Sequence, residues 1–192
     1  MDTLWEKHGT GYGKLVRFAD DSIIICKTEK QAKAAMALLK EIMRRLELTL
    51  NPDKTKTVNL WNGNEGFDYL GFHNRKMKRI SQKGQTCYKM EQFPSPKSLS
   101  KMRNKVREEL GFRHLLSCSM DNRIEELNPV LRGWKNYYGY GNSKAALNKT
   151  DRYLLEKFTL WHNKKRQNPE HRKGKWELNT RLIKRGLIKL AG

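Results

Sequence analysis

The chain has 192 residues, and its 40 Lys and Arg against 20 Asp and Glu give a formal net charge of +20. So basic a chain points to a polyanionic partner, while its five Trp, seven Tyr and six Phe exclude a purely disordered basic tail, so we expect a folded nucleic-acid-binding protein. No apolar run approaches the roughly 18 residues of a membrane span, residues 1–14 lack a signal-peptide core, and the three widely spaced cysteines predict reduced, mostly buried thiols in a cytoplasmic protein.

The first predicted element is a β-hairpin in the stretch LVRFADDSIIICK, where Asp20 and Asp21 interrupt an apolar, β-branched run. Adjacent strand residues point to opposite faces, so the two carboxylates can converge on one ligand only if they lie at the turn. A divalent cation such as Mg²⁺ would then offset their repulsion, which suits two-metal phosphoryl transfer. The alternative is a solvated Asp-Asp turn.

A helix, a turn and further strands are predicted next. Thr28 and Gln31 form a T-x-x-Q capping box before apolar residues that recur at helical spacing as far as Leu46. The segment Asn51–Asp53 predicts a turn, residues 55–60 a strand, FDYLGF another strand, and residues 75–90 a basic hairpin turning at Lys83-Gly84. Residues 1–94 therefore predict an α+β unit in which one helix covers a small antiparallel sheet.

The segment FPSPKS marks a boundary, with Ser95 as N-cap and Pro96 as first residue of a helix. Residues 95–162 then show three apolar stripes at helical spacing, which predicts a helical bundle. Pro129 lies in the second stripe, and we expect a new helix to start there with Asn128 as its cap rather than a kink. Residues 163–192 are expected to form a basic C-terminal tail.

Four motifs in chain order resemble one family. FADD resembles the aromatic-x-Asp-Asp motif of reverse transcriptases in the form found in group II intron proteins, and LNPDKT, FDYLGF and LNPVLRGWKNYYG follow it. The last is similar to the signature of the group II intron maturase-specific domain. The resemblance implies the C-terminal part of such a reverse transcriptase/maturase: the end of the palm over residues 1–94 and a helical thumb or maturase domain over 95–162.

The resemblance also implies roles for residues of the palm. Asp20 and Asp21 would be catalytic and would bind Mg²⁺, and Lys54 would lie near the leaving pyrophosphate. Phe18 would lie beside the primer end, and Leu70, Gly71 and Phe72 would form the primer grip. For Lys54 and Phe72, a solvated turn residue and a core aromatic are equally good interpretations.

In the helical part, basic residues opposite the apolar stripes are expected to contact RNA phosphates. Trp134 and Tyr138 continue a stripe and are expected to pack between helices, whereas Tyr137 and Tyr140 are better candidates for stacking on bases. The predicted RNA-binding residues are Arg132, Lys135, Tyr137, Tyr140, Arg152, Lys164, Lys165 and Arg166.

One departure from the family pattern bears on enzymology. Polymerases that resemble this chain take a further metal-binding aspartate from an upstream palm strand, and here only nineteen residues precede Asp20. We therefore expect weak or no Mg²⁺ binding in the isolated chain, and a truncated protein that binds group II intron RNA and assists splicing or mobility in a bacterial cell or at an organelle nucleoid. The alternative is an RNA-directed DNA polymerase that acts on a DNA primer-template once a separate fingers/palm chain completes it. A generic basic nucleic-acid protein leaves the four motifs unexplained.

Overall fold

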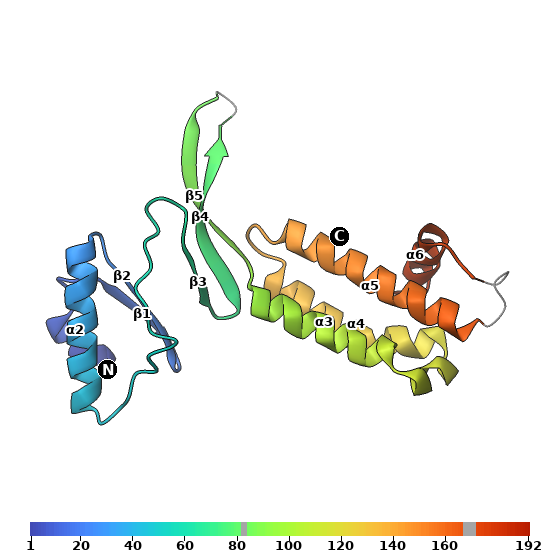
Figure 1. Cartoon of the computed structure of the whole chain (residues 1–192), viewed down its shortest axis with the longest axis horizontal. Helices are drawn as coiled ribbons and strands as arrows, with labels where there is room; N and C mark the ends of the chain where they lie inside the picture. Colours follow the sequence, from blue (N-terminus) through green and yellow to red (C-terminus); the bar gives the residue numbers. More distant parts are fainter. Residues whose placement is uncertain (82–83, 167–171) are drawn as a thin grey trace. The chain divides into compact units, whose positions relative to one another are not determined.

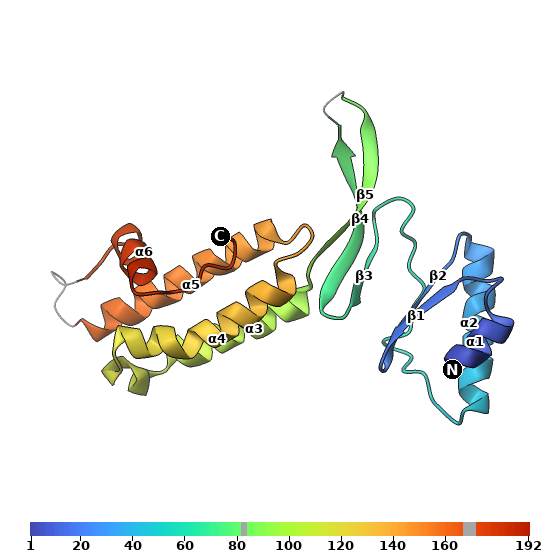
Figure 2. The ribbon, with the colours of Figure 1, turned by 180° about the vertical axis from the view of Figure 1, so that it is seen from behind.

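The computed structural model describes residues 1–81, 84–166 and 172–192. The chain divides into two compact units, Met1–Leu70 and Gly71–Gly192, each with a hydrophobic core of its own. Figure 1 and, from behind, Figure 2 show the elements of each unit.

The first unit contains the predicted hairpin and helix. Its elements are α1 (Asp2–His8), β1 (Lys14–Phe18), β2 (Asp21–Ile25), α2 (Glu29–Arg45) and β3 (Gly66–Tyr69). The side chain of Thr28 caps α2 by accepting a hydrogen bond from the Gln31 amide at 3.2 Å, so the predicted cap is confirmed. The helix α2 lies along the β1–β2 hairpin, and its buried residue Leu39 shares the core with Trp5 of α1. The sequence analysis did not predict α1.

The strand predicted over residues 55–60 is wrong, because this segment has no strand pairing. Side chains take its backbone donors instead: the Asn59 amide donates to Glu65 Oε2 at 2.7 Å, and the Trp61 amide donates to Asn59 Oδ1 at 2.8 Å. Asn and Glu side chains thus compete with a sheet ladder for the same N–H groups. The turn predicted at Asn51 is confirmed, since its Oδ1 accepts from the Asp53 amide at 3.0 Å.

The second unit begins with a long antiparallel hairpin. Its strands are β4 (Phe72–Ile80) and β5 (Thr86–Pro94), paired from Phe72↔Pro94 to Ile80↔Thr86. FDYLGF is therefore not one continuous strand: β3 ends at Tyr69, and Leu70 and Gly71 adopt positive φ angles of 48° and 79° before β4 begins. The basic hairpin is confirmed, with Gly84 at φ 75° in its turn, and Lys83 lies outside the described residues.

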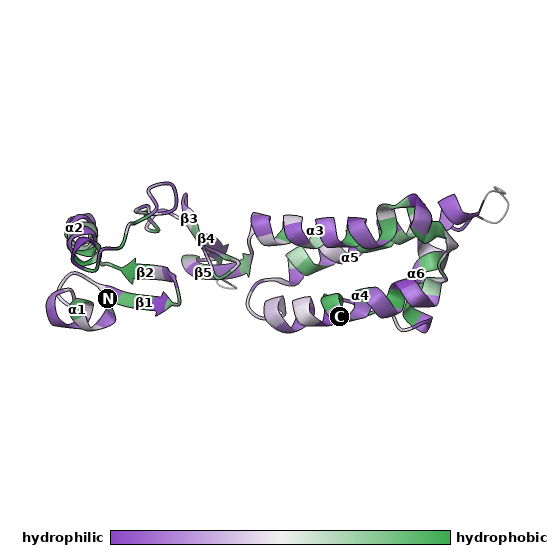
Figure 3. Ribbon diagram, turned by 90° about the horizontal axis from the view of Figure 1, so that it is seen from below, coloured by the Kyte–Doolittle hydropathy of each residue, from purple (hydrophilic) through white to green (hydrophobic). Residues whose placement is uncertain are grey.

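Helices make up the rest of the second unit: α3 (Pro96–Gly111), the 3-10 turn η1 (Arg113–Ser117), α4 (Met120–Tyr138), α5 (Lys144–Lys165) and α6 (Lys175–Lys184). Ser95 caps α3 with Pro96 at the first helical position, as predicted. The apolar faces of the helices turn toward one another (Figure 3), and the predicted stripes form the core. Fully buried members include Val106, Leu127 and Phe158.

The predicted restart of a helix at Pro129 is wrong, because α4 runs through this residue without interruption. Asn128, the expected cap, instead holds the end of the chain. Its Nδ2 donates to Gly186 O at 2.9 Å, and its Oδ1 accepts from the Ile188 amide at 3.0 Å. The side chain is thus used in a tertiary contact, and Pro129 itself is exposed on the outer face of the helix.

The last thirty residues contribute to the core of the second unit. Leu178 and Leu182 of α6 and Leu190 are buried, and Asp151 of α5 accepts from the backbone amides of Leu190 and Ala191 at 3.0 Å each. The two compact units therefore differ in extent from the three expected segments, 1–94, 95–162 and 163–192.

Two smaller expectations concern cysteines and membranes. All three cysteines are free thiols, as expected for a reduced protein, but they are half-buried rather than mostly buried. Within the described ranges, none of the helices combines the length and apolar character needed to cross a membrane.

Candidate functional site

The tip of the β1–β2 hairpin carries the two adjacent carboxylates. Pairing of Phe18 with Asp21 leaves Ala19 and Asp20 as the two turn residues, and Ala19 adopts a φ of 50°. This left-handed conformation is uncommon for a residue with a Cβ atom. Asp20 and Asp21 are both exposed, and Phe18 is 65% exposed beside them. The predicted position of the carboxylates at a hairpin turn is confirmed.

Arg17 organises the polar groups around this turn. Its Nη1 donates to Ala19 O at 2.8 Å, while its Nε and Nη2 donate to the two carboxylate oxygens of Asp2 at 2.8 and 2.6 Å. The hydrogen bond from Arg17 lowers the pKa of Asp2, and the same contact raises the pKa of Arg17, with a smaller contribution from Asp20. Both carboxylate oxygens of Asp2 therefore accept hydrogen bonds from Arg17.

Asp20 and Asp21 are the oxygen donors that Mg²⁺ prefers, and Mg²⁺ is commonly held by one or two carboxylates together with substrate phosphates. The pair fits a partial ligand set of this kind. Within the residues that the structure describes, no three His, Cys, Asp or Glu side chains cluster closely enough to hold a metal ion.

Gly71 and Phe72 pack against α4 in the second unit. Phe72 is buried, with ring centroids 5.4 Å from Tyr137 and 4.9 Å from Tyr138. A Cβ atom on Gly71 would lie 2.6 Å from the Tyr138 hydroxyl, and the positive φ of Gly71 also favours glycine. The core interpretation of Phe72 is therefore confirmed as packing, while a role for Leu70–Phe72 in gripping a primer stays a prediction.

The net charge is concentrated in one unit. Residues 71–192 contain 29 Lys and Arg against ten Asp and Glu, a formal charge of +19, whereas residues 1–70 contain eleven against ten. The helical unit therefore carries almost all the electrostatic attraction for a polyanion.

Family models match both units. Residues 4–74 match the model described as reverse transcriptase (RNA-dependent DNA polymerase), and residues 99–181 match the group II intron, maturase-specific domain. The chain belongs to the group II intron reverse transcriptase and maturase family. The predicted family and α+β fold class are thereby confirmed. A comparison with curated proteins gave no match.

The predicted RNA-binding residues of this reverse transcriptase/maturase chain fall into two groups. Some are exposed on the second unit and available to a ligand: Arg132, Arg152, Lys164 and Arg166, together with Tyr140, which is 74% exposed.

The other group takes part in tertiary contacts. Lys135 Nζ donates to Lys189 O at 3.0 Å, and Lys165 Nζ donates to Cys118 O. Tyr137 is half exposed, but its ring packs against Tyr138. Tyr138 is buried in the core of the second unit and Trp134 packs against that core, which confirms the packing between helices predicted for these two residues; their ring centroids lie 4.4 Å apart. RNA contact by either group stays a prediction.

Sequence reasoning missed several residues that face a cavity of the maturase unit: His162, Arg181 and Arg185. A signal for the last two was present, because Leu178 and Leu182 have helical spacing and Arg181 and Arg185 repeat it on the neighbouring side. Nothing in the sequence distinguishes His162 from the other histidines.

Proposed function

We propose that this chain binds structured group II intron RNA through residues 71–192 and thereby assists splicing or intron mobility. One observation carries the proposal: the maturase-specific match, residues 99–181, lies entirely within the unit of formal charge +19. Lys and Arg on a folded helical surface bind RNA backbone by releasing counterions. We place this activity in the cytoplasm of a bacterial cell or at an organelle nucleoid, where reduced thiols are the norm.

The proposal is tested by titrating the full chain with a labelled group II intron RNA over a range of salt concentrations. The binding constant should fall steeply with salt, by a logarithmic slope of about 0.7 to 0.9 for each phosphate contact. An unstructured RNA of equal length is the control for specificity. Binding that is absent at low salt, or unchanged by salt, contradicts the proposal, and self-splicing of the RNA with and without protein measures the assistance.

A second candidate function rests on the match of residues 4–74 to the reverse transcriptase model and on the carboxylates at the hairpin tip. Here Asp20 and Asp21 would hold a Mg²⁺ ion weakly, and the ion would supply positive charge to neutralise phosphoryl oxygens. Lys54, exposed in the turn after Asn51, supplies a cation for the leaving group.

Among the described residues no third His, Cys, Asp or Glu side chain joins the two carboxylates, so they would position a metal-bound substrate poorly. Primer extension by the isolated chain on an RNA template with a DNA primer should therefore be undetectable. Extension that appears only when a separate fingers/palm chain is added would establish the polymerase function. Robust extension by the chain alone, abolished by Asp20→Asn, would overturn the view that the ligand set is partial.

A further inference from the structure

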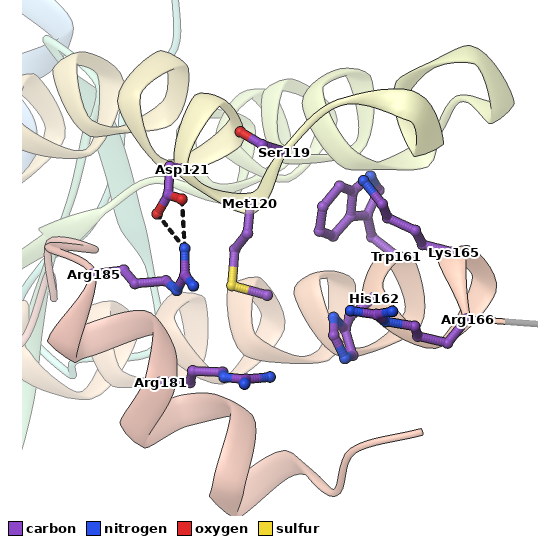
Figure 4. A pocket seen from close by; sticks show the side chains of 9 residues that line it. All are labelled: Ser119, Met120, Asp121, Trp161, His162, Lys165, Arg166, Arg181 and Arg185. Atoms are coloured by element: carbon purple, nitrogen blue, oxygen red, sulfur yellow. Dashed lines mark hydrogen bonds and ion pairs between the residues drawn. The ribbon is translucent and has the colours of Figure 1, made fainter. Parts of the chain in front are cut away.

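A cationic cavity lies within the second unit, between the start of α4, the end of α5 and α6 (Figure 4). Its volume is about 220 Å³, compared with roughly 30 Å³ for a water molecule in the liquid, so it can hold a polyatomic anion with several waters. Four cationic side chains line it, namely Lys165, Arg166, Arg181 and Arg185, against the single carboxylate of Asp121.

His162 at the base of this cavity is a buried polar group that lacks a partner. It is only 4% exposed, and within residues 1–81, 84–166 and 172–192 its Nε2 atom has no hydrogen-bond partner. Leaving such an atom unpaired costs about 1 to 3 kcal/mol. A ligand that accepts or shares a proton at Nε2 would recover part of this cost.

Four charged side chains interact electrostatically with His162: Arg181 and Glu177 of α6, and Arg166 and Lys173, which lie outside the helices. Burial lowers its pKa most, and Arg166, Arg181 and Lys173 lower it further, while Glu177 opposes them. The imidazole is therefore neutral at neutral pH, with three cationic side chains acting on it. An anion placed among these cations would raise the pKa of His162 toward its ordinary value.

Two of the cations are held in place by the protein, and two are not. Arg185 Nη1 donates to Asp121 Oδ1 at 2.6 Å (dashed in Figure 4), and Lys165 Nζ donates to Cys118 O. In the part of the chain that the structure describes, the guanidinium groups of Arg166 and Arg181 have no hydrogen-bonding or ion-pair partner. They are available to a ligand.

The start of α4 adds backbone donors to the same cavity. Ser119 caps the helix and accepts from the Asn122 amide at 3.1 Å, and Ser119, Met120 and Asp121 line the cavity. The first amides of a helix have no intrahelical acceptors, and they mark the positive end of its dipole. This end of α4 therefore favours an anion, as the side chains do.

We propose that this cavity binds one phosphate group, with Arg166 and Arg181 donating to its oxygens beside the buried imidazole of His162. Guanidinium groups match phosphate in a planar, two-donor geometry, and a compact tetrahedral anion suits donors that converge from three helices. The phosphate belongs to an RNA strand, and this assignment of its source rests on the RNA binding proposed above. Free inorganic phosphate offers the same chemistry and is the other source.

The phosphate site is tested without RNA. The His162 ring resonance of the full chain is followed by NMR as inorganic phosphate replaces chloride at constant ionic strength. We expect a saturable shift and a higher His162 pKa in phosphate. Arg181→Gln should weaken phosphate binding at least about tenfold, a change of roughly 1.4 kcal/mol. Arg107→Gln, which removes the same charge from an exposed position of α3, should leave it unchanged.

Circular dichroism checks that each variant folds, and Arg166→Gln serves as a second variant if Arg181→Gln does not. An unchanged His162 resonance, or equal effects of phosphate and chloride, overturns the site. Equal weakening by Arg107→Gln and Arg181→Gln also overturns it, since general charge would then explain the binding.

The source of the phosphate is decided by adding group II intron RNA to the same sample. If RNA binds, we expect it to shift the His162 resonance and to displace inorganic phosphate. RNA that binds without affecting His162 overturns the RNA source and leaves free phosphate as the ligand. Failure of RNA to bind at all, with the phosphate response intact, refutes the proposed function and not the phosphate site.

Discussion

The side chain of Asn128 joins α4 to the end of the chain, and its removal should loosen that contact. Asn128→Ala removes two hydrogen bonds, one to Gly186 O and one from the Ile188 amide. At about 1 kcal/mol net for each bond, the loss is about 2 kcal/mol. Alanine is a better helix former than asparagine and returns roughly 0.5 kcal/mol. We expect the contact to weaken by about 1.5 kcal/mol, or roughly tenfold in the local opening equilibrium.

Hydrogen exchange at the Ile188 amide measures this opening directly, because that amide loses its acceptor. The exchange rate should rise about tenfold under conditions where local opening and closing are fast compared with the chemical exchange of the open amide. Asn104→Ala is the matched control, since Asn104 is exposed in the middle of α3 and the same helix-propensity gain applies. An Ile188 amide that exchanges at the wild-type rate in Asn128→Ala would refute the reasoning, and so would equal acceleration in Asn104→Ala.

Three further predictions concern charge and pH. Arg132→Gln should reduce the logarithmic salt slope of RNA binding by about 1 with an unchanged melting temperature, whereas Lys135→Gln should also speed amide exchange near Lys189, its hydrogen-bond partner. Asp20→Asn should change the free energy of unfolding by no more than about 0.5 kcal/mol, measured by urea denaturation, because Asp20 is exposed; a larger loss would show a structural role for this carboxylate. The pKa of His162 is lower in the folded state than in the unfolded state. When the pH decreases below the pKa of the unfolded state, the unfolded chain binds more protons than the folded chain, so the free energy of unfolding decreases as the pH is lowered. The melting temperature should therefore drop between about pH 7.5 and about pH 5.5, and less so in His162→Gln; equal drops in both proteins would count against the burial of His162.

The predicted elements succeeded where local signals decide the structure. Ser95 followed by proline is a cap that needs only its own helix, and the apolar stripes have a period that defines a buried face. Asn128 followed by Pro129 carries the same local signal as Ser95 followed by Pro96. There it fails, because the Asn128 side chain bonds to residues some sixty positions further along the chain, which no local pattern reveals.

The candidate sites show the same division. The carboxylates at the hairpin turn followed from strand alternation, since only a turn lets neighbouring residues approach one ligand. The cavity around His162 could not be predicted in this way. It depends on the packing of α4, α5 and α6, and a single buried histidine has no spacing pattern.

The unequal division of charge between the units also has a thermodynamic consequence. A polyanion binds the folded helical unit more tightly than its unfolded chain only if folding gathers the cations into a surface, and such a ligand then raises the melting temperature by mass action. Residues 1–70, with eleven basic and ten acidic side chains, offer it no comparable attraction. Heparin or RNA should thus protect the amides of Val106, Leu127 and Phe158 from exchange while leaving those of Ala35 and Leu39 as they were, so that one chain would unfold in two separable steps.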